Sequence, residues 1–314
     1  MMQPLVKRPL RTPRWRSSVK TALTNYDLYL ICVPALIVLF LFRYYPMYGI
    51  QIAFKDFTIR NGFENSPWVG FKHFQTLFAM PEFHRVFWNT LILNLYRLVF
   101  QFPLPIILAI AINEVRSRAF KRTIQTVSYL PHFLSWVVIG AIFQSLLSST
   151  GVVNAMVRAF GGEPVVWLGE SQYFRSMLVV SDAWKNTGWG SIVYLAAIMA
   201  VDPQLYEAAL VDGAGRLRRI WHITLPCIRS TIFFIVILRL SAMLGSNVEQ
   251  ILVLYSSAVY DVGDVLSTYV YRIGLERMKF SFATAVDLFS SVIGFALLLG
   301  ANYASRAFGE RALW

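Results

Sequence analysis

Long apolar segments alternate with short polar segments along this chain. Each apolar segment has about 20 residues or more, which is the length that a helix needs to cross a bilayer. The predicted transmembrane helices cover residues 28–50, 87–112, 124–147, 174–199, 228–254 and 282–303. No tandem repeat, low-complexity segment or flexible linker interrupts the pattern. We therefore predict an all-α integral membrane protein with six transmembrane helices in one domain, residues 27–314, behind a basic tail, residues 1–26.

The composition agrees with a membrane protein. Hydrophobic residues make up 56% of the chain and charged residues 15%, whereas a soluble domain usually has about 25% charged residues. The net charge of +12 would be compatible with nucleic-acid binding, but six basic residues lie together before the first apolar segment. A cleaved signal peptide is the rival interpretation of this N-terminus. No small-residue cleavage pattern follows Phe42, so we expect an uncleaved transmembrane helix.

The basic residues also predict the orientation of the chain. Cytoplasmic loops carry an excess of Lys and Arg. One set of alternate loops and tails holds 16 basic residues, and the other set holds nine. The first set, which includes both termini and the loop between the fourth and fifth helices, is therefore predicted to be cytoplasmic. The outer loops are longer and rich in aromatic residues, as expected of an interfacial belt or of a docking surface for an extracytoplasmic partner.

The predicted cytoplasmic loop 202–226 has the local signals of two short helices. Asp202 can cap a helix that starts at Pro203, where no backbone N–H is needed. Gly213 can take the left-handed conformation that ends this helix, and a second helix begins near Arg216. Pro226 precedes the fifth transmembrane helix. A bent helix pair on the cytoplasmic face is the predicted result.

The same loop carries a specific motif. Its residues satisfy every fixed position of the pattern E-A-A-x3-G-x9-I-x-L-P, from Glu207 to Pro226. This pattern resembles that of binding-protein-dependent ABC importer permeases of type I. The segments "YYPMYGIQIAFKDF", "FKRTIQTVSYLPHFLSWVV" and "WKNTGWGSIVYLAA" are similar to those of the carbohydrate-importer permeases for polysaccharides, aldouronates and related acidic oligosaccharides. The resemblance implies a MetI-like core with both termini in the cytoplasm.

That resemblance implies a function and a set of partners. The chain is expected to form half of the membrane pore of an ATP-driven oligosaccharide importer in a bacterial cytoplasmic (inner) membrane, for alginate or other uronate oligomers. The implied partners are a second homologous permease, two ATPase subunits and an extracytoplasmic solute-binding protein. This chain would hold no cofactor, because ATP and Mg²⁺ would bind the ATPase subunits; the sequence contains no Gly-Lys dipeptide and so no P-loop. The implied ATPase-coupling residues are Glu207, Ala208, Ala209, Asp212, Gly213 and Arg216.

Polar residues inside the predicted spans are candidates for the substrate path. Charged groups are costly in a membrane, so they usually face a cavity or pair with one another. Midspan cations would suit a uronate chain, and tryptophan faces would suit sugar rings. The candidates are Arg97, Asp182, Trp184, Lys185, Asn186, Trp189, Arg239, Asn247, Glu249, Gln250 and Asp287. A structural role is the alternative for each; Asp182 and Lys185 stand three residues apart on one helix, a spacing at which opposite charges neutralise each other.

Three other functions remain open on the sequence alone. The importer could carry neutral oligosaccharides. An ion-coupled secondary transporter would need coupling-ion sites and usually inverted repeats, and it would leave the motif at Glu207 unexplained. A membrane enzyme would need a nucleophile with a base, or a metal cluster. The two cysteines and four histidines are scattered, so the sequence predicts a non-catalytic subunit with no metal.

Overall fold

The structure is a computed structural model that describes residues 26–245 and 247–307. These residues are almost entirely helical, and their β-structure is limited to one isolated antiparallel bridge between Lys55 and Trp68. The predicted all-α fold is confirmed. The chain forms two compact units, divided between Gln51 and Ile52, and each is described separately. Residues 1–25 of the predicted basic tail lie outside the described residues.

The first unit contains the expected first transmembrane helix. It consists of α2 (Tyr26–Leu39), a π-helical turn η1 (Phe40–Tyr44) and most of the 3-10 segment η2 (Tyr45–Phe54). The stretch Leu30–Phe54 is long and apolar enough to cross a membrane. Its large side chains are exposed, as at Ile31 (75%), which is expected of a helix whose solvent is lipid.

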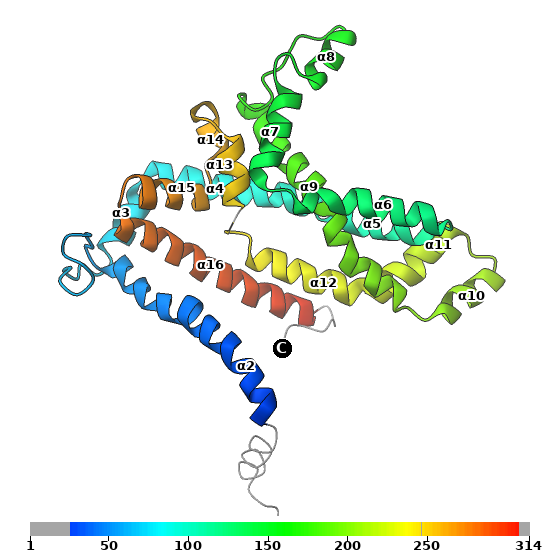
Figure 1. Cartoon of the computed structure of the whole chain (residues 1–314), viewed down its shortest axis with the longest axis horizontal. Coiled ribbons are helices and arrows are strands. Elements are labelled where there is room, and N and C mark those ends of the chain that lie inside the picture. Colours follow the sequence, from blue (N-terminus) through cyan, green and yellow to red (C-terminus); the bar gives the residue numbers. More distant parts are fainter. Residues whose placement is uncertain (1–25, 246, 308–314) are drawn as a thin grey trace, which may run out of the picture. The chain divides into compact units, whose positions relative to one another are not determined.

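The second unit contains all the remaining helices (Figure 1). The first half of this unit comprises α3 (Lys72–Ala79), α4 (Pro81–Tyr96), η3 (Arg97–Gln101), α5 (Pro103–Glu114), α6 (Arg118–Tyr129), η4 (Leu130–Phe133), α7 (Trp136–Leu147) and α8 (Val152–Ala159). The second half comprises α9 (Ser171–Met199), α10 (Pro203–Val211), α11 (Arg216–Arg219), η5 (Ile220–Thr224), α12 (Leu225–Ser241), α13 (Val248–Leu254), η6 (Ser257–Val259), α14 (Tyr260–Gly263), α15 (Leu266–Tyr271), η7 (Arg272–Glu276) and α16 (Phe280–Ala307).

Five helical stretches among the described residues are long and apolar enough to cross a membrane. They are Leu30–Phe54, Pro81–Glu114, Trp136–Ala159, Arg216–Ser241 and Phe280–Arg306. The expected fourth span corresponds to α9, which is one continuous helix of 29 residues. At a rise of about 1.5 Å per residue α9 is long enough, but Arg175, Asp182 and Lys185 make it less apolar. The expected fifth span divides after Ser241, because α12 ends there and α13 starts at Val248.

The predicted second transmembrane helix is one helical stretch, Pro81–Glu114, with an irregular turn before Pro103. The α-helical pattern changes to a π-helical turn at η3, where the N–H of Phe102 donates to the carbonyl of Arg97 over 2.9 Å. Proline lacks an N–H and its ring crowds the preceding turn. The turn places Arg97 at the centre of the unit, where 7% of it is exposed.

The predicted third helix, 124–147, is two helices. α6 ends at Tyr129, the 3-10 turn η4 contains Pro131, and α7 starts again with Ser135 as its N-cap, whose side chain accepts from the N–H of Val138. Lys185 on α9 donates to the carbonyl oxygens of His132 and Leu134, which the break leaves without helical partners. The interruption is therefore satisfied by a side chain from another helix.

Close helix packing fixes the centre of the second unit. α5 lies along α9, and α12 lies along α16. A Cβ added at Gly188 on α9 would lie 1.9 Å from the backbone carbonyl oxygen of Ser128 on α6. Only glycine allows that approach.

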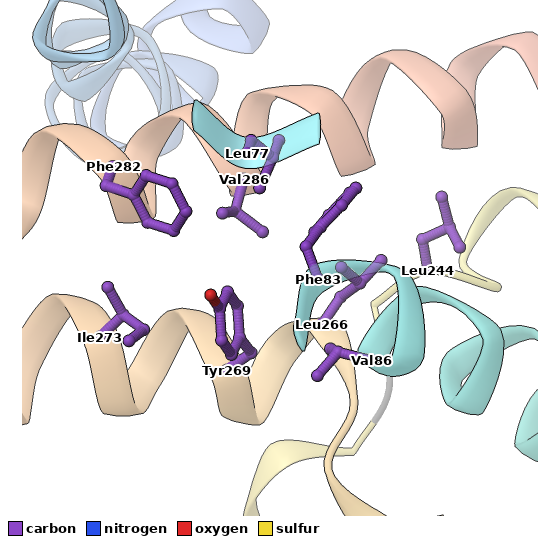
Figure 2. Packing of buried hydrophobic residues seen from close by; sticks show 9 residues of the cluster. All are labelled: Leu77, Phe83, Val86, Leu244, Leu266, Tyr269, Ile273, Phe282 and Val286. Carbon is purple, nitrogen blue, oxygen red and sulfur yellow. The ribbon is translucent and has the colours of Figure 1, made fainter. Parts of the chain in front are cut away.

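Three apolar clusters complete the packing. Figure 2 shows the one that joins the N-terminal side of α4 to α15 and α16, in which Val86, Leu266 and Val286 are at most 1% exposed. A second cluster surrounds Phe174 near the start of α9, and a third joins α5, α9 and α12 around Ala109 and Ile228. Removal of such side chains from contact with solvent stabilises the helix arrangement.

A buried ion-pair cluster ties the segment after α13 to the start of α4. Arg272 pairs with Asp264 and, over 3.1 Å, with Glu82, while Thr268 donates to Asp264 over 2.8 Å. Burial alone would lower the pKa of the Arg272 guanidinium, but Asp264 and Glu82 beside it raise this pKa above its usual value. Arg272 therefore stays charged.

Candidate functional site: the cytoplasmic loop and a polar cavity

The helix predicted after Asp202 is α10. The Asp202 carboxylate accepts from the N–H of Gln204 over 3.0 Å, and Pro203 occupies the first helical position. The cap and the proline satisfy the start of the helix without help from the rest of the protein. These features confirm the predicted cap at Asp202 and the predicted helix start at Pro203.

α10 ends at the predicted glycine. Gly213 has a φ of +72°, a conformation that residues with a Cβ adopt at a cost. The N–H of Ala214 donates to the carbonyl of Ala209 over 2.8 Å, and that of Gly213 donates to Leu210 over 3.1 Å, which are the bonds of a Schellman motif. The chain then turns into α11. α11 continues through η5 into α12 as one helical stretch, Arg216–Ser241, so the predicted second short helix is instead the start of the fifth span.

The implied coupling residues are accessible. Glu207, Ala208, Asp212, Gly213 and Arg216 are exposed, and Ala209 is partly buried. The exposed surface around them is also apolar, with Val211 88%, Leu217 74%, Trp221 67% and Leu210 61% exposed. A concentration of exposed apolar side chains among charges is typical of an interface with another protein or with a membrane.

Two side-chain contacts attach this loop to neighbouring helices. The Tyr206 hydroxyl lies 3.0 Å from the Thr224 hydroxyl in η5, within hydrogen-bond distance. Arg216 pairs with Glu114, at the end of α5, over 4.0 Å. These contacts join α10 to η5 and α11 to the end of α5.

Deeper in the same unit, several of the predicted path residues surround one cavity. It has a volume of about 140 Å³ and lies between the η3 region, α9 and the end of α12. Arg97, Asp182, Arg239 and Asn247 line it, together with Asn94. These residues are up to 153 positions apart in the sequence. The tertiary structure thus brings together four of the eleven candidates.

A hydrogen-bonded network supports the wall of the cavity that carries Arg97. Arg97 Nε lies 3.8 Å from Asp182 Oδ2, and Arg97 Nη2 donates to Gln250 Oε1 over 2.7 Å. Asp182 Oδ1 accepts from Asn186 over 2.6 Å and from Asn247 over 3.2 Å. Buried charges are stable in proteins only when such partners surround them.

Gln250 anchors that network and does not line the cavity. Its amide donates to the carbonyl of Leu178 over 2.6 Å and to the Ser181 hydroxyl over 2.9 Å. Gln250 is fully buried. Two further candidates, Asn186 and Gln250, therefore hold the residues that form the cavity wall.

Lys185 does not reach the cavity and does not pair with Asp182. Its ammonium group satisfies the break in the third span and lies 5.3 Å from the centroid of the Trp136 ring. Nearby, the ring of Trp189 stacks on that of His132 at 4.6 Å, and His132 also contacts Asn186 over 3.0 Å. The structure assigns Lys185 and Trp189 to the packing around the helix break.

The other three candidates lie elsewhere. Trp184 lines a separate, mainly apolar cavity of about 760 Å³ between α5, α6 and α9. Glu249 is exposed in the first turn of α13. Asp287 is exposed on α16 beside a cavity of about 400 Å³ that shares Ala242 and Gly245 with the polar cavity.

Sequence reasoning missed Asn94 and the partners of the cytoplasmic loop. Asn94 precedes Arg97 by three positions, so helical spacing alone would place both on one face. No spacing in the sequence indicated that Thr224 would contact α10 or that Glu114 would contact α11, because each contact joins two separate segments of the chain. Among the described residues, no group of three or more His, Cys, Asp or Glu side chains could hold a metal ion.

Several helices long and apolar enough to span a membrane, the capped helix α10 with its exposed residues and a polar cavity between helices are features of a multi-pass membrane transport subunit. Residues 101–309 match the family described as the binding-protein-dependent transport system inner membrane component. This match covers more than half of the chain. The protein belongs to this family and is a permease subunit of an ABC transport system.

Individual relatives are similar to this chain over nearly its whole length. The chain is 46% identical to Protein LplB of Bacillus subtilis (strain 168), over 91% of each chain. It is 43% identical to the polygalacturonan/rhamnogalacturonan transport system permease protein YteP of the same organism, over 96% of this chain and 94% of the relative. It also superposes with a TM-score of 0.86, at 41% identity, on a chain of a bacterial alginate ABC transporter solved with an alginate pentasaccharide-bound periplasmic protein; the superposition covers 94% and 99% of the two chains.

Proposed function

We propose that this chain is the permease subunit of an ATP-driven, binding-protein-dependent importer of acidic oligosaccharides in a bacterial cytoplasmic (inner) membrane. The proposal for the substrate rests on two similar proteins. One is a polygalacturonan/rhamnogalacturonan permease and the other belongs to an alginate transporter, and both substrates carry sugar carboxylates. The cavity lined by Arg97 and Arg239 supports an anionic substrate, because two guanidinium groups face a single carboxylate there.

The proposed coupling mechanism uses the cytoplasmic loop. The observation that carries it is the exposed apolar surface on α10 and α11, next to Glu207 and ended by Gly213. An ATPase subunit would cover this surface and move α10 when ATP closes the ATPase pair. The contacts of Tyr206 with Thr224 and of Arg216 with Glu114 would then transmit the movement to α12 and α5.

This mechanism requires partners. A second, homologous permease would form the other half of the pore, two ATPase subunits would hold ATP and Mg²⁺, and an extracytoplasmic binding protein would deliver the substrate. In this proposal the chain has no catalytic role. Its outer loops would receive the binding protein, and the buried cluster of Arg272, Asp264 and Glu82 would keep part of that surface rigid.

The test is ATP hydrolysis and uptake by the complete complex in liposomes, with uronate oligomers and neutral oligosaccharides of equal length. We expect uronate oligomers to stimulate both. A Glu207→Ala/Gly213→Ala variant should assemble but lose about tenfold or more of its uptake, since interface contacts of this kind carry about 2 kcal/mol. A Gln204→Ala/Gly215→Ala variant in the same loop is the matched control.

Two outcomes would contradict parts of the proposal. Normal coupled uptake by the Glu207→Ala/Gly213→Ala variant would disprove the coupling role. Stimulation by neutral oligosaccharides alone would retain the importer and reject its acidic specificity.

A further inference from the structure

The two arginines of the polar cavity differ in their surroundings. The Arg97 side chain is 8% exposed and is held by Asp182 and Gln250. Arg239 stands in the last turn of α12 and is exposed, and no carboxylate within ion-pair distance of it occurs among the described residues. Arg97 is therefore compensated within the protein, and Arg239 is not.

The charges of the cavity do not balance. Asp182 is the one carboxylate among the lining residues, and it is already used. Its Oδ1 accepts from Asn186 and Asn247, and its Oδ2 faces Arg97. One unit of positive charge therefore remains in the lining of the cavity, at Arg239.

The size of the cavity limits what can use this charge. Its volume of about 140 Å³ is several times what one water molecule needs, so one charged group of an oligosaccharide chain fits inside it. A planar carboxylate matches the two parallel N–H donors of a guanidinium, and the amides of Asn94 and Asn247 lie in the same wall.

We propose that the cavity is a subsite for a single sugar carboxylate, and that Arg239 is the residue that selects for it. Arg97 is a positioning residue, which orients the wall through Asp182. The inference rests on the proposed importer function and deepens it. It also assigns different roles to Arg97 and Arg239, although both were predicted alike as arginines inside a span.

The test compares a galacturonate trimer with its carboxyl-reduced form, which has the same length and linkage but no charge. Equilibrium binding of each is measured on the detergent-solubilised complex of both permeases and the ATPase subunits, without binding protein. The unmodified complex should bind the acidic trimer more tightly. Arg239→Gln should reduce this preference about tenfold, because a hydrogen-bonded charge pair has a free energy of about 1.5 kcal/mol or more, whereas Arg239→Lys should retain most of it.

Two further variants make the assignment specific. Arg229→Gln removes an exposed arginine from the same helix, ten positions before Arg239 and outside the cavity, and it should leave the preference unchanged. Arg97→Gln/Asp182→Asn removes a matched pair of charges, so the acidic preference should persist even if both affinities fall. Loss of preference in this double variant, with retention in Arg239→Gln, would overturn the proposal.

Failure of the Arg239 assignment can be distinguished from failure of the proposed importer function. ATP-driven uptake of the acidic trimer into liposomes, together with an unchanged preference in Arg239→Gln, would overturn this inference alone. Equal binding of the two trimers by the unmodified complex would also overturn it. Absence of ATP-driven uptake of every oligomer by the unmodified complex would reject the proposed function itself.

Discussion

The cytoplasmic loop and the polar cavity are built by opposite means. Each structural signal of α10 comes from within about a dozen residues of the others: Asp202 caps the helix, Pro203 starts it and Gly213 ends it. The cavity has no local signals. Arg97, Asp182 and Arg239 come from three helices, and the buried pair of Arg97 and Asp182 is stable only because its amide partners from other helices are in place. An exposed docking surface can be local, whereas a buried charged site has to be assembled.

This difference predicts how strongly each region depends on single residues. The largest effect is expected in the cavity, from Arg97→Met. It leaves Asp182, whose side chain is 2% exposed, without its counter-ion, at a cost of about 3–5 kcal/mol. Thermal unfolding of the purified complex in detergent measures this loss of stability. Arg97→Met/Asp182→Asn should recover much of the loss, and a double variant no more stable than the single one would contradict the assigned pair.

The next effect is expected where α9 meets α6. Gly188→Ala places a methyl group within 1.9 Å of the Ser128 carbonyl oxygen, so the helices must separate, at a cost of about 1–3 kcal/mol. The same unfolding experiment measures it. Gly300→Ala on α16, where no atom lies within 4 Å of the added Cβ, should be neutral. Equal stability of the two variants would show that α6 and α9 do not approach this closely.

A smaller effect is expected at the end of α10. Gly213→Ala forces a residue with a Cβ to adopt a φ of +72°, which costs about 1 kcal/mol. Gly215→Ala is the matched control, because Gly215 has a φ of −65° that alanine adopts freely. Limited proteolysis of the loop and the unfolding temperature report the difference. Equal behaviour of both variants would mean that Gly213 does not end the helix.

The smallest effect on stability is expected from Glu207→Gln. Glu207 is exposed, and surface substitutions of this kind usually change stability by less than about 0.5 kcal/mol. Under the proposed mechanism, uptake should fall nevertheless, because the side chain faces the ATPase subunit. Measurement of the unfolding temperature and of uptake on one preparation separates the two. A clear loss of stability would instead indicate a structural role for Glu207.

Sequence reasoning worked best where a signal was local. The all-α fold and the start of α10 at Pro203 were predicted and are confirmed. The division of the third span at Pro131 was missed, although proline stands there, because the apolar pattern continues through the break. Lys185 donates to a carbonyl oxygen at this break. Its role could therefore not be inferred while the break itself was not predicted.

Charge pairing was the least predictable feature. Asp182 and Lys185 stand three apart on one helix, and spacing alone would allow them to pair. In the structure Asp182 faces Arg97 and Lys185 donates to backbone carbonyls of the third span. Both charges are buried on the side where α9 meets other helices, so their partners come from those helices.

The sequence by itself determined that this protein crosses a membrane several times, that a capped helix starts at Pro203 in its loop 202–226, and that it resembles importer permeases. Hydrophobic length and helix capping are local properties of the chain, so no fold is needed to read them. Only the tertiary structure decided which polar residues share a cavity and which hold the helices together. A buried charge needs partners from all sides, and only the packing of distant helices supplies them.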